Sequence, residues 1–135
     1  MKKQPFNTEL ICQHWIEMSD NDFEAMIDLY NSKKYNWALF IGHLVIEKLL
    51  KASYVKHNLE HPPLTHNLLK LALLSGFDIS DEIQLQLDTI TTFNMNARYD
   101  DYKMAFYKKC TESFSTYWID QIKNLRLWIK QQLTV

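Results

Sequence analysis

The scarcity of glycine and proline constrains the fold of this chain more than any other feature. Only two glycines and three prolines occur among its 135 residues, against roughly 12% for an average protein. All-β folds need frequent turns, and phosphate-binding loops need clustered glycines, so both classes are excluded. Hydrophobic and charged residues make up 47% and 23% of the chain, which is ordinary for a globular protein. We therefore expect one all-α domain spanning residues 1–135.

The spacing of apolar residues predicts five helical segments. They cover about residues 9–30, 37–56, 65–74, 80–93 and 111–133. In the first segment, Ser19 and Asp22 resemble a capping box that would divide it into two helices. The second segment is apolar around most of its circumference, which is typical of a central helix, and Gly42 within it indicates the close approach of another helix. Short connections favour an up-and-down bundle of four to five helices.

The segments between these helices carry turn signals. Thr65 is the expected N-cap of the third helix, and Gly76 is expected to end it. Residues 95–102 lack helical periodicity, so we expect a loop there.

No stretch of the chain has the length and hydropathy of a membrane span. Residues 1–5 include two lysines but no apolar segment, so they do not resemble a secretory signal. Cys12 and Cys110 are too few for a disulfide framework or a zinc site, and the histidines lack the neighbours that metal ligands need. We expect a cytoplasmic protein with two reduced thiols, and with neither a metal nor another cofactor.

Charge is unevenly distributed along the chain, although the formal net charge is only -1. Residues 9–28 contain six acidic and no basic residues, whereas residues 103–130 contain six basic and two acidic ones. These two helices could pair within the bundle or across a dimer. They could also be complementary solvated faces that contribute little to stability.

Polar residues of the central helix recur at four-residue spacing. His43, Glu47 and Lys51 lie on one stripe, with Lys48 beside it. Glu47 followed by Lys51 is the favourable order for a helical ion pair. The stripe is either a polar seam that faces a cleft or a partner, or the solvent edge of the helix.

A second dense polar element is the sequence Arg-Tyr-Asp-Asp-Tyr at residues 98–102. An arginine between tyrosines can hold a phosphate or stack on a base. Arg98 can equally act as an internal clamp that bridges Asp100 or a helix end.

In order along the chain, these elements resemble the HEPN domain family. The strongest match is residues 35–52, where an aromatic residue and an alanine precede an apolar run and the sequence Glu-Lys-Leu-Leu-Lys-Ala. Further matches are Trp15 with Asp22, residues 66–69 after a proline-containing loop, and residues 96–101. The last of these is similar to an Ala-Arg-Tyr-Pro-Asp turn, with Asp100 where proline is usual.

The resemblance implies a bundle of four or five helices, usually a homodimer, with the loop before the last helix near the dimer cleft. Many HEPN proteins are metal-independent ribonucleases, including toxins paired with a nucleotidyltransferase antitoxin. Those enzymes carry an arginine and then, after four to six residues, a histidine. Here Arg98 matches the arginine, but Lys103, Met104 and Ala105 stand at the histidine positions, and the last histidine of the chain is His66.

The catalytic pair is therefore incomplete, and efficient RNA cleavage is not expected. Tyr102 is close in sequence, but a phenol is a poor base at neutral pH. The first hypothesis is a non-catalytic HEPN module that binds a nucleotide, RNA or a protein partner. The second is a weak ribonuclease in which His66 reaches Arg98 in space. The third is a purely assembling role in a toxin–antitoxin-like pair with a nucleotidyltransferase. The candidate ligand-binding residues are Arg98, Tyr99, Asp101, Tyr102, Lys48, Lys51, Glu47 and His66.

Overall fold

The computed structural model describes residues 6–134, so the expectation about residues 1–5 lies outside it. The described chain is helical without a strand, which confirms the all-α class. Its six helices are α1 (Thr8–Asn31), α2 (Tyr35–Asn58), α3 (Leu68–Leu74), α4 (Asp81–Arg98), α5 (Ala105–Lys109) and α6 (Glu112–Leu133). None of these helices combines the length and hydropathy that crossing a membrane requires.

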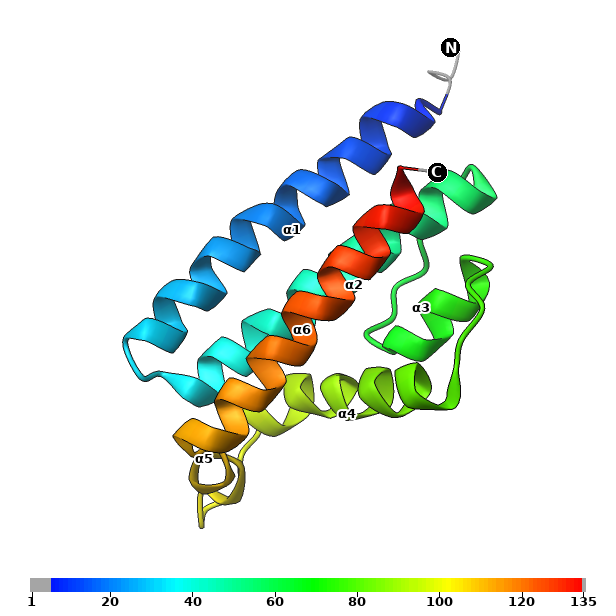
Figure 1. Ribbon diagram of the computed structural model, residues 1–135. Coiled ribbons are helices and arrows are strands. Elements are labelled where there is room, and N and C mark those ends of the chain that lie inside the picture. The colour runs from blue at the N-terminus through cyan, green and yellow to red at the C-terminus, as the bar shows by residue number, and fades with distance from the viewer. Residues whose placement is uncertain (1–5, 135) are drawn as a thin grey trace.

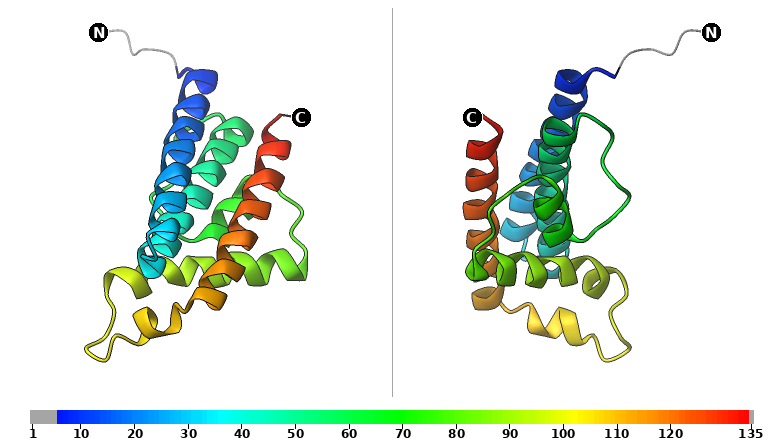
Figure 2. Two further views of the ribbon diagram at one scale, coloured as in Figure 1. Left: turned by 60° about the vertical axis from the view of Figure 1, so that its left-hand side comes forward. Right: turned by 90° about the vertical axis from the view of Figure 1, so that its right-hand side faces the viewer.

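The long helices α1, α2 and α6 lie side by side, and α4 crosses them near the end where α1 turns into α2 and α6 begins (Figures 1 and 2). Helix α2 packs against α1, α3, α4 and α6, so it is the central element of the bundle. This explains the apolar character around most of its circumference, because each neighbour covers a different side.

Gly42 of α2 lies at a close approach between the long helices. A Cβ atom at this position would lie 2.6 Å from Cδ1 of Ile122 on α6 and 3.1 Å from Sδ of Met26 on α1. The glycine therefore lets two neighbouring helices pack on the same point of α2, as its position in the sequence indicated.

Three predicted local features differ in the structure. Helix α1 is continuous, because Ser19 is buried and its Oγ donates a hydrogen bond to the carbonyl of Val45 instead of capping a helix. The N-cap of α3 is Asn67 rather than Thr65, since the Asn67 side chain accepts from the backbone N–H of Lys70. Helix α4 continues to Arg98, beyond the predicted end of its periodic segment.

Helix α5 was not predicted, and it depends on two aspartates of the preceding loop. Asp100 accepts hydrogen bonds from the backbone N–H groups of Phe106 (3.0 Å) and Tyr107 (2.8 Å). Asp101 accepts one from the N–H of Ala105 at 3.0 Å. These bonds satisfy the first donors of a helix that is only five residues long.

The acidic first helix and the basic last helix pair within the chain. Asp20 of α1 accepts hydrogen bonds from Arg126 at 3.2 Å and from Lys130 at 2.7 Å, both on α6. Of the alternatives given for this charge pattern, the structure therefore shows ion pairs within the bundle.

Candidate functional site

The polar stripe of α2 is buried. His43, Glu47 and Lys51 are 0%, 3% and 8% exposed. The stripe is therefore not the solvent edge of the helix but a polar seam beneath neighbouring segments. Burying a charged side chain is unfavourable unless it has a partner, so each polar residue of the seam is expected to be paired.

His66 covers this seam from the connection between α2 and α3. Its Nδ1 atom lies 2.6 Å from Oε1 of Glu47, and Oε2 of Glu47 accepts from Nζ of Lys51 at 3.3 Å. A carboxylate only accepts hydrogen bonds, so Nδ1 of His66 carries the proton. The His66 side chain is 60% exposed while that of Glu47 is 5% exposed, so a buried carboxylate holds a histidine that faces solvent.

His43 of α2 also contacts the connection between α2 and α3. Its Nε2–H donates to the backbone carbonyl of His66 at 2.9 Å, and its Nδ1 lies 3.3 Å from Nδ2 of Asn94 on α4. Burial lowers the pKa of His43, and this effect exceeds the opposing influence of the His66 carbonyl and of Glu47. His43 is therefore neutral, with one ring nitrogen donating and the other accepting.

Asn94 joins the seam to the end of α4. It is buried, and its Oδ1 has no hydrogen-bond partner within the described chain. The backbone carbonyl of Asn94 accepts from Nε of Arg98 at 3.4 Å. A short series of contacts thus leads from His66 through His43 and Asn94 to Arg98.

Arg98 is exposed at the last position of α4. Its guanidinium lies over the ring of Tyr99, 5.1 Å from the centroid, and its other contact is with Sδ of Met95. It bonds to its own helix end and does not bridge Asp100. Among residues 6–134, no carboxylate forms an ion pair with Arg98.

Tyr99, Asp101 and Lys109 line a cavity of about 290 Å³ with other residues of the α4–α5 segment, but Arg98 is not among its lining residues. Asp100 lines it too. Partial burial would raise the pKa of Asp100, but the backbone N–H groups of Phe106, Tyr107 and Asp101 outweigh it and lower that pKa. Asp100 therefore stays ionised, and its carboxylate oxygens accept hydrogen bonds from backbone N–H groups.

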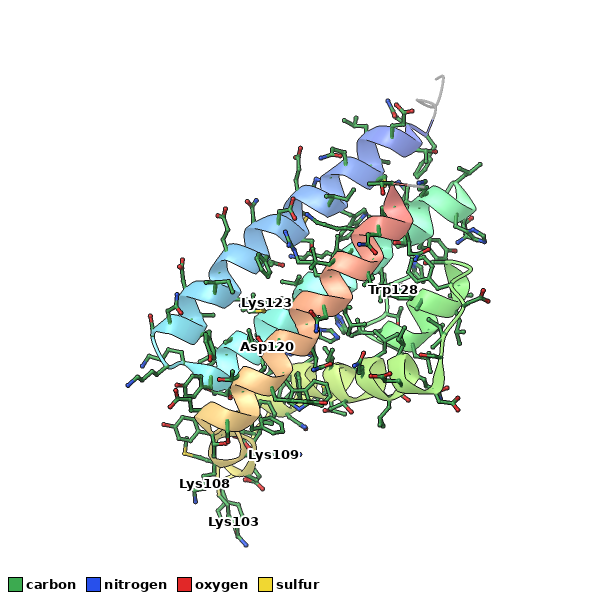
Figure 3. The ribbon with its side chains drawn as sticks, viewed as in Figure 1. Lys103, Lys108, Lys109, Asp120, Lys123 and Trp128 are labelled. Carbon is green, nitrogen blue, oxygen red and sulfur yellow. The ribbon has the colours of Figure 1, made fainter. Side chains whose placement is uncertain are left out.

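Further basic and aromatic residues extend this region. The Tyr102 side chain is 90% exposed, and Nζ of Lys103 lies 5.6 Å from its ring centroid. Lys103, Lys108 and Lys109 gather at the α5 end of the molecule (Figure 3). We call the exposed set Arg98, Tyr99, Tyr102, Lys103, Tyr107, Lys108 and Lys109 the basic–aromatic surface.

The predicted site residues fall into two groups. Glu47 and Lys51 belong to the seam and His66 covers it, while Arg98, Tyr99, Asp101 and Tyr102 belong to the α4–α5 segment. Lys48 joins neither group, because its Nζ pairs with Asp22 of α1 at 2.5 Å.

Sequence reasoning missed several members of both groups. Asn94 gave no signal, since a single asparagine in a helical pattern is unremarkable. The lysines at positions 103, 108 and 109 did give one, because they cluster within a few residues of Arg98. Within the described part of the chain, no three histidine, cysteine, aspartate or glutamate side chains come together as metal ligands would.

Comparison with known proteins agrees with this architecture. The family model of the HEPN domain matches residues 12–132. No match was found among curated proteins or among solved structures. Because the match covers nearly all of the helical bundle, the chain belongs to the HEPN domain family.

Proposed function

We propose that this protein is a HEPN module that binds single-stranded RNA through the basic–aromatic surface. Proteins that hold single strands combine cations, which contact phosphates, with aromatic rings, on which bases stack. Both features occur together at the end of the molecule formed by α4, the following loop and α5.

The observation that carries this proposal is the state of Arg98. Its guanidinium is exposed and bonds to no carboxylate within residues 6–134, yet its Nε and the Tyr99 ring hold it in place at the α4 end. An arginine fork without an acidic partner is well suited to a phosphate, since it can donate two parallel hydrogen bonds.

The surrounding charges favour an anionic ligand. Residues 98–109 contain four basic and two acidic residues. The two acids, Asp100 and Asp101, accept hydrogen bonds from backbone N–H groups of the loop and of α5. Their charge is therefore partly offset locally, while the basic side chains project outward.

Catalysis by the arginine and histidine of HEPN ribonucleases is not part of this proposal. Lys103 and Met104 stand in the loop before α5, and Ala105 begins that helix. None of the three can transfer protons as an imidazole does at neutral pH.

The proposal is tested by titrating a fluorescently labelled single-stranded oligoribonucleotide and following its anisotropy. Arg98→Ala is expected to weaken binding about tenfold, because it removes a charge-assisted hydrogen bond to phosphate. Lys70→Ala is the matched control, since Lys70 is exposed on α3, away from this surface. Equal affinities of wild type and Arg98→Ala, or no binding by wild type, would overturn the proposal.

We further propose that the module acts in the cytoplasm as a homodimer, with a nucleotidyltransferase as its protein partner. Family membership supports this assembly. A single-chain mass by light scattering at micromolar concentration would contradict the dimer, and failure to co-purify with a co-expressed nucleotidyltransferase would contradict the partner.

A further inference from the structure

The cavity formed by the end of α4, the following loop and α5 combines aromatic and polar side chains. Its volume is about 290 Å³, close to the lower limit of roughly 300 Å³ for pockets that hold small molecules. Tyr99 and Phe106 contribute rings to its lining, and Asn96 and Asp101 contribute polar groups. A space of this size and composition suits one heterocyclic ring system that also forms hydrogen bonds.

The two aspartates of this cavity differ in the hydrogen bonds that they already accept. Oδ1 of Asp100 accepts from the backbone N–H groups of Asp101 and Phe106, and its Oδ2 accepts from a further N–H of α5. Asp101 uses Oδ1 for the N–H of Ala105 at 3.0 Å, and its Oδ2 accepts no hydrogen bond within the described residues. A carboxylate has about four lone-pair sites and no donor. Asp101 therefore retains acceptor capacity for a ligand that donates.

The carboxylate of Asp101 is fixed in place by the loop that carries it. The backbone N–H of Asp101 donates to Asp100 at 3.0 Å, and its carbonyl accepts from the N–H of Met104 at 2.9 Å. Its side chain accepts from the first residue of α5. A ligand that meets a fixed carboxylate loses little free energy to ordering the loop.

Asn96 provides the opposite hydrogen-bonding character in the same cavity. It is exposed on α4, and its side-chain amide makes no hydrogen bond to another residue of the range 6–134. The amide nitrogen can donate to an acceptor on a ligand. The cavity thus offers a carboxylate that only accepts and an amide that can donate.

Guanine is the RNA base whose Watson–Crick edge matches this pair of groups. Its N1–H and 2-amino group are neighbouring donors that one carboxylate can accept, and its O6 is an acceptor for an amide. Adenine and cytosine each carry one amino group beside a ring nitrogen that accepts, and uracil carries its one N–H between two carbonyls. Single-stranded RNA exposes these edges to side chains. The other three bases would each place an acceptor against the carboxylate.

We propose that this cavity binds a guanine base of the RNA strand, and that Asp101 is the residue that selects it. The inference rests on the proposed RNA binding at the basic–aromatic surface. It adds a base preference to a surface whose cations contact only phosphates, which every RNA sequence shares.

Tyr99 connects the cavity to the arginine of the basic–aromatic surface. It lines the cavity, and the guanidinium of Arg98 lies 5.1 Å from the centroid of its ring. Tyr99 is 67% exposed, so the guanidinium leaves much of the ring available for stacking on a base. A base in the cavity and a phosphate on Arg98 therefore contact the same side chain, as neighbouring parts of one strand can.

The charge of Asp101 makes it a selective group rather than a general contributor to affinity. A carboxylate beside a phosphate-binding surface repels RNA, so it favours binding only where a base donates to it. Removing this charge should therefore weaken binding of strands with guanine and strengthen binding of strands without it. Loss of folded protein would weaken both.

The test measures dissociation constants of labelled oligouridylates that carry one central guanine or one central adenine, by fluorescence anisotropy. Wild type is expected to bind the guanine strand about tenfold more tightly, which is within the discrimination that one bidentate base contact provides. Asp101→Asn keeps an oxygen for the N–H of Ala105 but accepts poorly from two adjacent donors. It should bind both strands equally, and the adenine strand at least as tightly as wild type does.

Asp88→Asn is the matched control. It makes the same change of charge at an exposed position of α4, and Asp88 is not among the lining residues of the cavity. This variant should keep the tenfold preference for guanine.

Inosine in place of guanine tests the contact with Asp101 on the wild-type protein, because inosine lacks only the 2-amino group. Wild type should bind the inosine strand more weakly than the guanine strand, whereas Asp101→Asn should not distinguish them. Free guanosine 5′-monophosphate should displace the guanine strand only at much higher concentration, since it lacks the further phosphates that Lys103 and Lys108 contact. Equal competition by this mononucleotide and by unlabelled guanine strand would overturn the placement of the base within an RNA strand.

Failure of the inference and failure of the proposed function give different results. If wild type binds none of the strands, the proposed function falls and the inference falls with it. If wild type binds all strands equally or prefers another base, guanine recognition is overturned while RNA binding stands. A preference for guanine that persists in Asp101→Asn would overturn the assignment of Asp101. The inosine comparison on wild type decides the matter even if Asp101→Asn folds poorly.

Discussion

His43 is the residue at which burial and ionisation are most directly coupled. It is fully buried, and it uses one ring nitrogen to donate to His66 and the other to accept from Asn94. A second proton would remove the acceptor and bury a charge beside Lys51. Burial accordingly lowers the pKa of His43 below its ordinary value of 6.5.

This shift predicts that the protein loses stability in mild acid. Above about pH 6.5, His43 is neutral in both folded and unfolded chains and adds no pH dependence. Below that pH the unfolded chain takes up a proton that the folded chain resists, so the free energy of unfolding falls until the folded-state pKa is reached. Denaturant titrations between about pH 5 and about pH 8 measure it.

His43→Gln is the variant for this measurement, and His61→Gln is the control. Glutamine does not titrate, so the stability of His43→Gln should depend less steeply on pH below about 6.5 than that of wild type. His61→Gln should follow wild type. Parallel curves for wild type and His43→Gln would show that the acid sensitivity arises elsewhere.

At the scale of elements, α1 and α6 both pack closely against α2 at Gly42. Ile122 and Met26, whose atoms lie closest to a Cβ at this position, are both fully buried. The core around them is packed like a crystal, so added volume displaces neighbours.

Gly42→Val is therefore expected to lower the free energy of unfolding by about 1–3 kcal/mol, as overpacked cores do. Gly42→Ala should lose less, because alanine recovers about 1 kcal/mol of helix propensity and because Cδ1 of Ile122 is the far end of a flexible side chain. Urea denaturation followed by circular dichroism measures both. A valine variant as stable as wild type would mean that α6 moves freely over α2.

The long helices were predictable because their apolar residues recur with helical periodicity. Ser80 and Thr111, at which two of the predicted segments begin, are the N-caps of α4 and α6, and each accepts from the backbone N–H three residues later. The predicted helix break at Ser19 was wrong because a capping box is recognised from neighbouring residues alone. The hydrogen bond that Ser19 makes to Val45 depends instead on how α1 packs on α2. Helix α5 was missed for a similar reason, since its donors are satisfied by aspartates outside the helix.

The candidate site was predictable only in its separate parts. Four-residue spacing placed Glu47 and Lys51 on one stripe, and a dense polar sequence singled out Arg98. That His66 contacts Glu47 does not follow from spacing, because the connection between α2 and α3 returns over the helix by a path no local pattern encodes. The role of Asn94 likewise depends on how α4 crosses α2.

At the scale of the whole molecule, the two groups of polar residues have different characters. The seam is buried on the central helix, and its charged side chains are paired. The basic–aromatic surface lies at the α5 end, where short segments carry exposed cations (Figure 3). The first group is fixed by its internal contacts, and the second is exposed, which is what the proposed RNA binding requires.

The overall charge of the protein predicts how its RNA binding responds to salt. A net charge of -1 gives no general attraction to a polyanion, so binding must come from the local cations Arg98, Lys103, Lys108 and Lys109. If each contacts one phosphate of a single strand, the logarithm of the binding constant should fall against the logarithm of salt concentration with a slope of about −3. Anisotropy titrations at several salt concentrations measure this slope.

Replacing both Lys108 and Lys109 by alanine should make the slope shallower by about 1.4, since two phosphate contacts are lost. Lys70→Ala should leave it unchanged, because that lysine is exposed on a different helix. Arg126 and Lys130 are poor substitutes as controls, since both are engaged with Asp20. A slope near zero for wild type, or the same slope for wild type and the double variant, would locate RNA binding away from the α5 end.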